Sequence, residues 1–119
     1  MEALWRKRLE GKRLLIFDFD GTLANTSPLH AAAFAQVLSP LGVRVDYPSI
    51  AGLKTLDAMR SCLASHAREL SEDELAALAK AKQLEVRRLI GAGLDPLPGV
   101  DPFLRWARDA YQLAMVTSG

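Results

Sequence analysis

The segment LLIFDFDGTL, residues 14–23, decides the fold, because a short apolar run ends there in two aspartates separated by one residue. Four apolar residues, Leu14 to Phe17, are typical of a strand buried on both faces of a parallel sheet. Asp18 then lies at the carboxyl end of that strand, which is where open α/β sheets bind ligands. Since an unpaired carboxylate is costly to desolvate, the segment predicts a strand that carries carboxylates to a binding site.

The pair of aspartates has two other interpretations. The first is a surface turn that contains two acidic residues and needs no ligand. The second is a calcium-binding EF-hand loop, which can also begin with Asp-x-Asp but requires glycine at its sixth position and glutamate at its twelfth. Counted from Asp18, those positions hold Leu23 and Leu29, so the sequence excludes an EF-hand.

The composition indicates one modest domain with a hydrophobic core, because half of the 119 residues are hydrophobic. The formal net charge of +1 gives no electrostatic reason to expect nucleic acid or an anionic membrane as a partner, and residues 6–13 form a solvated basic segment. No apolar segment approaches the length of a membrane span, and the single cysteine, Cys62, is expected to pack in a helix. We therefore expect a soluble, cytoplasmic protein.

Turn and cap signals divide the rest of the chain into helices and a second strand. Ser27, followed by Pro28, favours a helix start, and the capping box from Ser71 to Glu74 opens a longer helix. The predicted elements are helices at about 27–41, 56–68, 71 to 91 or 93, and 102–110, a loop at 43–48 and a buried strand at 112–119. Two strands separated by helices indicate an α/β fold with parallel strands and a helical insertion.

The segment from Asp18 to Leu23, Asp-Phe-Asp-Gly-Thr-Leu, resembles the first signature motif of the haloacid dehalogenase superfamily, whose members are mostly magnesium-dependent phosphatases. The helical insertion resembles the cap of the subgroup that includes β-phosphoglucomutase and related phosphatases. Three further segments carry this resemblance, namely residues 27–30, 97–100 and 113–119. It implies a partial Rossmann-like α/β core, residues 1–26 and 95–119, with a helical cap at residues 27–94.

The resemblance also implies a site. Asp18 would attack phosphorus and form an aspartyl-phosphate, and Asp20 would act as general acid and base. Both residues would hold Mg²⁺, Asp20 through its backbone carbonyl. Thr117 and Ser118 would bind the transferring phosphoryl group, and Gly21 would supply the tight backbone that follows the strand.

Three residues of the helical insertion are candidates for the substrate side. His30 lies where β-phosphoglucomutase relatives also carry histidine, and Lys82 lies where such relatives place a lysine toward the substrate. Their structural alternatives are a helix histidine satisfied by a backbone carbonyl and a solvated surface lysine. Lys54 stands beside Thr55, the position where the mutase branch has an arginine that binds a second phosphate. Because lysine lacks the bidentate fork of arginine, this departure favours a phosphatase over a mutase.

Other parts of the family pattern are missing. The first motif usually continues with an aspartate, where this chain has Ala24 and Asn25. No residue matches the lysine of the third motif or the metal-binding carboxylates of the fourth, since the sequence ends at Gly119. We therefore expect a truncated form of the protein. The alternative is that a second chain supplies the missing strands. The apolar edge of its second strand would favour self-association.

The resemblance implies a magnesium-dependent phosphohydrolase that acts on a small phosphorylated metabolite, in an incomplete form. Two alternatives stay open, a phosphosugar mutase of the same fold and a noncatalytic remnant that acts as a binding module. The identity of the substrate stays open, because cap loops set specificity in such folds and no residue here encodes a recognisable sugar, nucleotide or glycolate contact.

Overall fold

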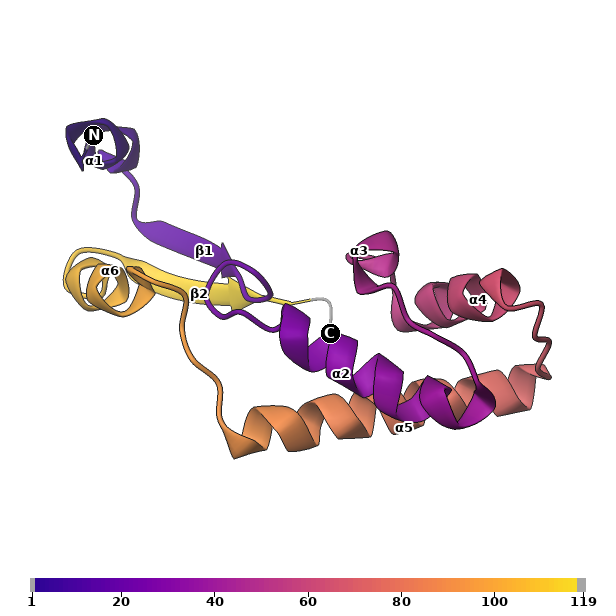
Figure 1. The fold of residues 1–119 in the computed structure, drawn as a ribbon. Helices are drawn as coiled ribbons and strands as arrows, with labels where there is room; N and C mark the ends of the chain where they lie inside the picture. Colours follow the sequence, from indigo (N-terminus) through magenta and orange to yellow (C-terminus); the bar gives the residue numbers. More distant parts are fainter. Residues whose placement is uncertain (1, 118–119) are drawn as a thin grey trace. The chain divides into compact units, whose positions relative to one another are not determined.

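The computed structural model describes residues 2–117. Its elements in chain order are α1 (Glu2–Leu9), β1 (Leu14–Asp18), α2 (Ser27–Leu38), the 3-10 helix η1 (Ser39–Leu41), α3 (Tyr47–Ile50), α4 (Thr55–Ser65), α5 (Glu72–Ala92), α6 (Val100–Ala107) and β2 (Gln112–Val116) (Figure 1). The chain forms two compact units. We call Met1–Asn25 with Asp95–Gly119 the α/β unit and Thr26–Leu94 the helical unit.

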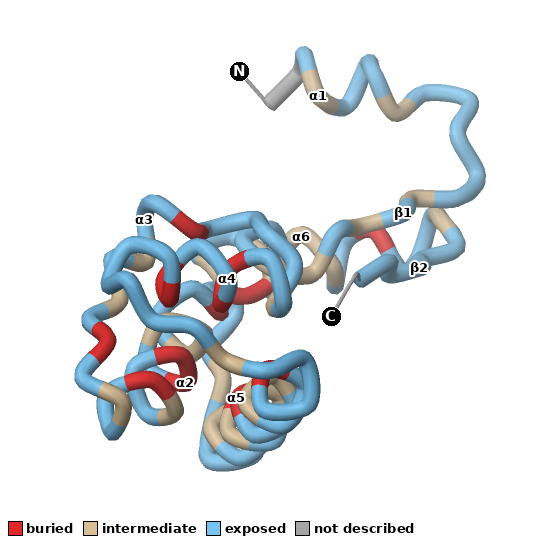
Figure 2. Tube along the Cα trace, turned by 90° about the vertical axis from the view of Figure 1, so that its right-hand side faces the viewer, coloured by how far each residue is buried: buried red, intermediate tan, exposed pale blue. Residues whose placement is uncertain are grey.

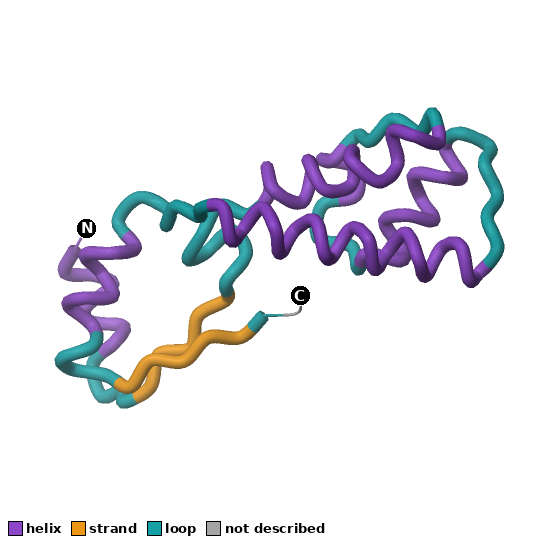
Figure 3. The backbone as a smooth tube through the Cα atoms, turned by 90° about the horizontal axis from the view of Figure 1, so that it is seen from below, coloured by secondary structure: helices purple, strands orange, loops and turns teal. Residues whose placement is uncertain are grey.

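The sheet of the α/β unit consists of β1 and β2, which lie side by side (Figure 3) and pair in parallel. Leu14 pairs with Gln112 at one end and Asp18 with Val116 at the other. The Gln112 N–H also donates to the carbonyl of Arg13, at 2.8 Å. The predicted α/β fold with parallel strands is therefore confirmed.

The prediction that both strands are buried is wrong for the described chain. All five residues of β2 are exposed, and β1 alternates between exposed and half-buried residues. Side chains alternate between the two faces of a sheet, and Phe17 faces α6, with its ring centroid 6.1 Å from that of Phe103. On the opposite face Ile16 stays 61% exposed, because no element within residues 2–117 buries it.

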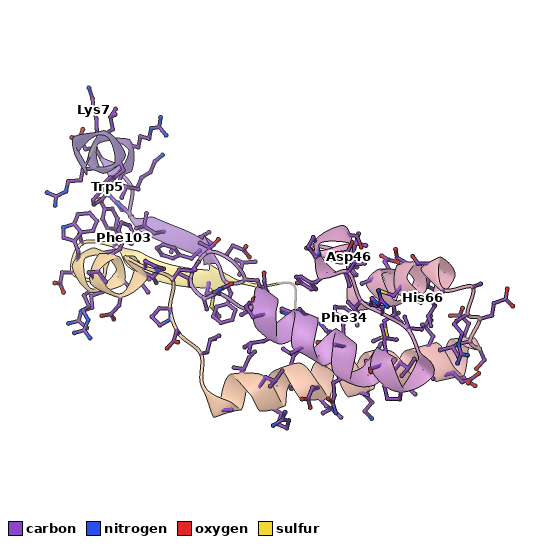
Figure 4. The ribbon with its side chains drawn as sticks, viewed as in Figure 1. Trp5, Lys7, Phe34, Asp46, His66 and Phe103 are labelled. Atoms are coloured by element: carbon purple, nitrogen blue, oxygen red, sulfur yellow. The ribbon has the colours of Figure 1, made fainter. Side chains whose placement is uncertain are left out.

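Helix α1 overlaps the first half of the segment 6–13 that the sequence indicated to be solvated. The ring of Trp5 contacts Phe103 and Trp106 edge to face, at centroid distances of 5.5 and 5.0 Å (Figure 4). The guanidinium of Arg6 lies over both tryptophan rings, and the hydroxyl of Tyr111 donates to the carbonyl of Leu9, at 3.3 Å. Aromatic stacking and cation–π attraction thus attach α1 to α6.

In the helical unit, α2 and α4 pack against α5 around a hydrophobic core (Figure 2). The buried residues of this core are Phe34, Leu38, Val43, Ile50, Ala58, Met59, Cys62, Leu63 and Leu75. Burial raises the pKa of the Cys62 thiol, and the charge of Asp46 adds to the effect. The structure therefore confirms the packing role expected of this cysteine, because a thiol that resists ionisation is a poor nucleophile.

The helix boundaries agree with the sequence signals in part. The capping box is present, because the Glu74 N–H donates to Ser71 Oγ and the Ser71 N–H donates to Glu74 Oε1, both at 3.1 Å. Ser27 was expected to cap α2, but the N-cap is Thr26, which makes no side-chain cap bond. The predicted loop at 43–48 ends in the short helix α3, whose bounds are Tyr47–Ile50. None of the helices within the described residues is long and apolar enough to cross a membrane.

Replacing the capping serine tests how much the long helix α5 depends on its start. We expect Ser71→Ala to lower the free energy of unfolding by about 1 kcal/mol, because the Glu74 N–H loses its acceptor. Urea unfolding followed by far-UV circular dichroism measures this loss. Ser61→Ala, at an exposed position inside α4, is the control and should not destabilise the chain. Equal losses in both variants would contradict the prediction.

The same capping box makes part of the stability depend on pH. Hydrogen bonds from Ser71, first from its backbone, lower the pKa of Glu74. A carboxyl whose pKa is lower in the folded state stabilises that state fully above the unfolded pKa of about 4.3, and this contribution is lost as the pH falls through the folded value. We therefore expect Glu74→Gln to lose less stability than the parent between neutral pH and about pH 3. Identical pH profiles from acid titrations of the two proteins would refute this.

Candidate functional site

The carboxylates and the threonine of the first and second motifs lie at one end of the sheet. Asp18 is the last residue of β1 and pairs with Val116, the last residue of β2. Thr117 follows Val116 directly and is exposed. Because the strands are parallel, their carboxyl ends meet at the same edge, so the structure brings Asp18 and Thr117 to that edge.

The turn after β1 is tightly hydrogen-bonded. The carbonyl of Phe19 accepts from the N–H groups of Thr22, Leu23 and Ala24, at 3.0 to 3.3 Å. The Gly21 N–H donates to the carbonyl of Ala24 at 2.9 Å, and its φ of 76° lies in the left-handed region that favours glycine. These bonds fix the backbone next to the two aspartates.

A second set of bonds ties this turn to the loop that precedes α6. Ala24 is 3% exposed and forms a bridge with Pro96. The Leu97 N–H donates to the carbonyl of Leu23 at 3.0 Å. Asp20 also forms a bridge with Ala24, so the segment that holds both aspartates is anchored to the returning part of the chain.

The donor atoms at the sheet edge suit a hard divalent cation. Asp18 is exposed and offers carboxylate oxygens, and the half-buried Asp20 offers its backbone carbonyl oxygen. Among the described residues there is no group of three or more His, Cys, Asp and Glu that could hold a metal ion. Mg²⁺ is often held by only one or two carboxylates, with water and phosphate oxygens completing its shell. The pair Asp18 and Asp20 therefore fits Mg²⁺, whereas a metal that needs three such side chains finds no site in residues 2–117.

The predicted phosphate-binding residue Ser118 lies outside the described residues. Gly21 and Thr117 are described, and both are exposed. Their phosphate-binding role stays a prediction.

The helical unit brings His30 and Lys82 together. Lys82, on α5, is 3% exposed, and its Nζ lies 2.9 Å from Nδ1 of His30, on α2. The ammonium also lies over the ring of Phe34, 4.6 Å from the centroid. The interpretation of Lys82 as a solvated surface lysine, which the sequence left open, is therefore wrong, because this side chain is buried. The sequence reasoning missed Phe34 as a partner, although the spacing of four residues from His30 places both on one helix face.

Lys54 lies at the N-cap of α4 and is exposed. Its neighbour Thr55 is half-buried, and the Thr55 hydroxyl accepts a hydrogen bond from Gln83 Nε2 at 2.9 Å. Lys54 thus lies at the start of α4, which the hydrogen bond from Gln83 links to α5.

The helical unit also has a surface cavity of about 630 Å³, which contains none of the predicted site residues. Arg60 and Glu72 are part of its wall and form a bidentate ion pair, with N–O distances of 3.2 and 3.0 Å. The remaining lining residues are Leu63, Ala64, Ala67, Arg68, Glu69, Leu70 and Leu75. The lining carries two arginines and two glutamates, of which Arg60 and Glu72 neutralise each other.

Comparison with known proteins gives three results. The family model described as haloacid dehalogenase-like hydrolase matches residues 15–119. The fructose-1-phosphate phosphatase YqaB of Escherichia coli K12 is 35% identical over 94 residues, which cover 77% of this chain and 49% of that protein. Protein CbbY of Rhodobacter capsulatus is 32% identical over 117 residues, covering 89% of this chain and 50% of that protein.

Solved structures support the same fold. A predicted phosphoglycolate phosphatase from Haemophilus somnus 129pt superposes with a TM-score of 0.78 at 23% identity, covering 89% of this chain and 51% of that one. The chain spans about half the length of the curated relatives it matches, 49% and 50%. Because the family model covers residues 15–119, we conclude that the chain belongs to the haloacid dehalogenase-like hydrolase family.

Proposed function

We propose that this chain carries the nucleophile and the cap of a magnesium-dependent phosphohydrolase that acts through an aspartyl-phosphate on a small phosphorylated metabolite. One observation carries the proposal. Asp18, the last residue of β1, pairs with Val116, and Val116 directly precedes Thr117. The phosphatase names of two relatives support the same chemistry. The chain matches about half of each relative, so the activity of the whole protein is part of the proposal.

The reaction consists of two displacements at phosphorus. The Asp18 carboxylate attacks phosphorus, the bond to the ester oxygen breaks, and the leaving oxygen takes a proton from Asp20. Water then attacks the aspartyl-phosphate, returns a proton to Asp20 and releases inorganic phosphate together with the free Asp18 carboxylate. The exposure of the two residues supports Asp18 as the nucleophile and Asp20 as the general acid and base, since Asp18 is open to a substrate and Asp20 is half-buried.

Other groups at the sheet edge would bind the phosphoryl oxygens. The hydroxyl of Thr117 and the backbone near Ser118 can donate hydrogen bonds to oxygens on which charge develops. Gly21 lets the turn approach them, because it has no Cβ and holds a left-handed conformation. Mg²⁺, held by the Asp18 carboxylate and the Asp20 backbone carbonyl, would neutralise negative charge when bound.

The cap would supply the substrate contacts. His30, Lys82 and Lys54 all lie in the helical unit and offer N–H groups to phosphate or hydroxyl oxygens. The alternative of a phosphosugar mutase has less support. The position where the mutase branch has an arginine holds Thr55 in this chain, so it has no guanidinium. The Thr55 hydroxyl instead accepts a hydrogen bond from Gln83.

We also propose a cytoplasmic location, without nucleic acid or membrane as a partner. The net charge of +1 supports this, since it creates no strong field that would attract a polyanion. Self-association through the apolar strand β2 is part of the same proposal, because Met115 and Val116 are 54% and 59% exposed.

The nucleophile can be tested by hydrolysis of a generic phosphate ester by the 119-residue chain. We expect turnover that requires Mg²⁺ and falls by about 10³-fold or more in Asp18→Asn, because the amide cannot attack phosphorus. Asp109→Asn is the control, since Asp109 is an exposed aspartate of the same unit away from the sheet edge. Full activity in Asp18→Asn would overturn the assignment. No turnover in the parent, with phosphate binding that Asp18→Ala leaves intact, would favour the noncatalytic binding module.

The turn can be tested through Gly21. An added Cβ would meet no atom within 4 Å, so the cost of Gly21→Ala is the left-handed backbone alone, about 1–2 kcal/mol. Gly91→Ala is the matched control, because this glycine also has no atom within 4 Å but lies in the last turn of α5, where alanine stabilises by up to about 1 kcal/mol. Urea unfolding of both variants should therefore give shifts of opposite sign, and shifts of the same sign would contradict the prediction.

A further inference from the structure

The ring of His66 joins two segments of the helical unit that lie far apart in the sequence. His66 is the C-cap of α4, and its Nε2 accepts the backbone N–H of Arg44, at 3.0 Å. Arg44 belongs to residues 42–46, the loop that runs from η1 to α3. Nδ1 of the same ring lies 3.0 Å from the carbonyl of Cys62, one turn earlier on α4. One imidazole therefore bridges the end of α4 and this loop.

The end of α4 fixes the backbone that carries this ring. The N–H of His66 donates to the carbonyl of Leu63, at 3.1 Å, so the carbonyl of Cys62, one residue earlier, accepts from the ring instead. Ala67 follows with a φ of 51°, and the Arg68 N–H donates to the carbonyl of Leu63, at 2.9 Å. A left-handed residue and a bond of this kind close the helix, so the position of His66 is set by the helix end.

The two contacts of the ring assign its protons. A carbonyl oxygen only accepts, so Nδ1 must carry a proton, and Nε2 must keep its lone pair to accept from the Arg44 N–H. A proton on Nε2 would place one donor against another, and the bond to Arg44 would be lost while the bond to Cys62 remained. Histidine changes its charge between about pH 5 and 8, and His66 is exposed, so a proton can reach the ring without unfolding.

The loop that the ring holds is part of the cover of the core. Val43 is 3% exposed and belongs to the same buried cluster as Cys62, which is 4% exposed. Asp46, at the N-cap of α3, contributes to the raised pKa of the Cys62 thiol through its charge. Displacement of residues 42–46 would therefore uncover this part of the core.

Charged groups of both neighbouring segments act on the ring in opposite directions. The loop carries Arg44 and Asp46, and the segment after α4 carries Arg68 and Glu69. The two arginines disfavour a proton on His66 and the two carboxylates favour it. All four side chains are exposed, so solvent and salt screen them, and the hydrogen bond to Arg44 decides whether the loop is held.

We propose that His66 is a pH-sensitive latch of the helical unit. The neutral ring holds residues 42–46 against the end of α4, and protonation of Nε2 releases them. Release frees the connection between η1 and α3 and opens the buried cluster at Cys62. The latch does not rest on the proposed function, because all of its contacts lie within the helical unit.

Hydrogen exchange of the Arg44 amide, followed by NMR, tests the latch. We expect its protection factor to fall about fivefold between pH 8 and pH 5, the factor typical of one lost hydrogen bond, in step with the protonation of His66. The Glu74 amide is the internal reference and should keep its protection, because its acceptor is Ser71 Oγ, which does not titrate. A protection factor of Arg44 that stays constant while His66 titrates would overturn the latch.

Two variants at position 66 separate the titrating ring from its place in the fold. His66→Gln offers a carbonyl oxygen that accepts without titrating, so the protection of Arg44 should be the same at both pH values. His66→Phe has no acceptor, so the protection should be low at both. His30→Gln removes the other histidine of the chain and should keep the pH dependence of the parent. A fall with pH that persists in His66→Phe would assign the effect to another group and overturn the latch.

The single cysteine reports the release of the loop. The rate at which a disulfide reagent labels Cys62 is divided, at each pH, by the rate in the urea-unfolded chain, which corrects for the effect of pH on a thiol. This ratio should rise from pH 8 to pH 5 in the parent and stay constant in His66→Gln. A constant ratio in the parent would show that the loop stays in place without the bond to His66, and would overturn the release.

Discussion

The parallel pairing of β1 and β2 is the constraint on which the rest of the structure depends. Parallel neighbours cannot be joined by a tight turn, so the chain between Asp18 and Gln112 must leave the sheet and return by a long connection. Everything from the aspartate turn to α6 belongs to that connection, the whole helical unit included. The register matters as much as the direction, because a slip of one residue would move Asp18 to the other face of the sheet. The site at the sheet edge is thus a consequence of strand register.

The sequence predicted the elements that local signals specify. The strand β1 and its acidic end follow from an apolar run, and the capping box of Ser71 and Glu74 follows from two side chains three residues apart. Helix α1 was missed because its stability comes from contacts with α6, more than ninety residues away, and not from its own sequence. The burial of the strands was overpredicted for a related reason. An apolar strand indicates that a cover is needed, but only tertiary structure shows which residues supply it.

The candidate site divides in the same way. The places of Asp18, Asp20 and Thr117 could be predicted, because they depend on where two strands end. The pairing of His30 with Lys82 could not, because 52 residues separate them and their contact depends on how α2 packs against α5. A lysine on a long amphipathic helix is usually solvated, and nothing within α5 distinguishes Lys82 from the exposed Lys80. The distinguishing signal lies on the partner helix, where a histidine and a phenylalanine stand one turn apart.

The burial of Lys82 depends on the side chains that α2 presents to it. Moving an ammonium out of water costs several kcal/mol, and hydrophobic replacements of buried charges are often neutral or stabilising. The imidazole of His30 and the ring of Phe34 offset part of this cost. The contacts of His30 and Phe34 with this charge depend on the packing of α2 against α5, so the place of the lysine in the helical unit follows from that packing.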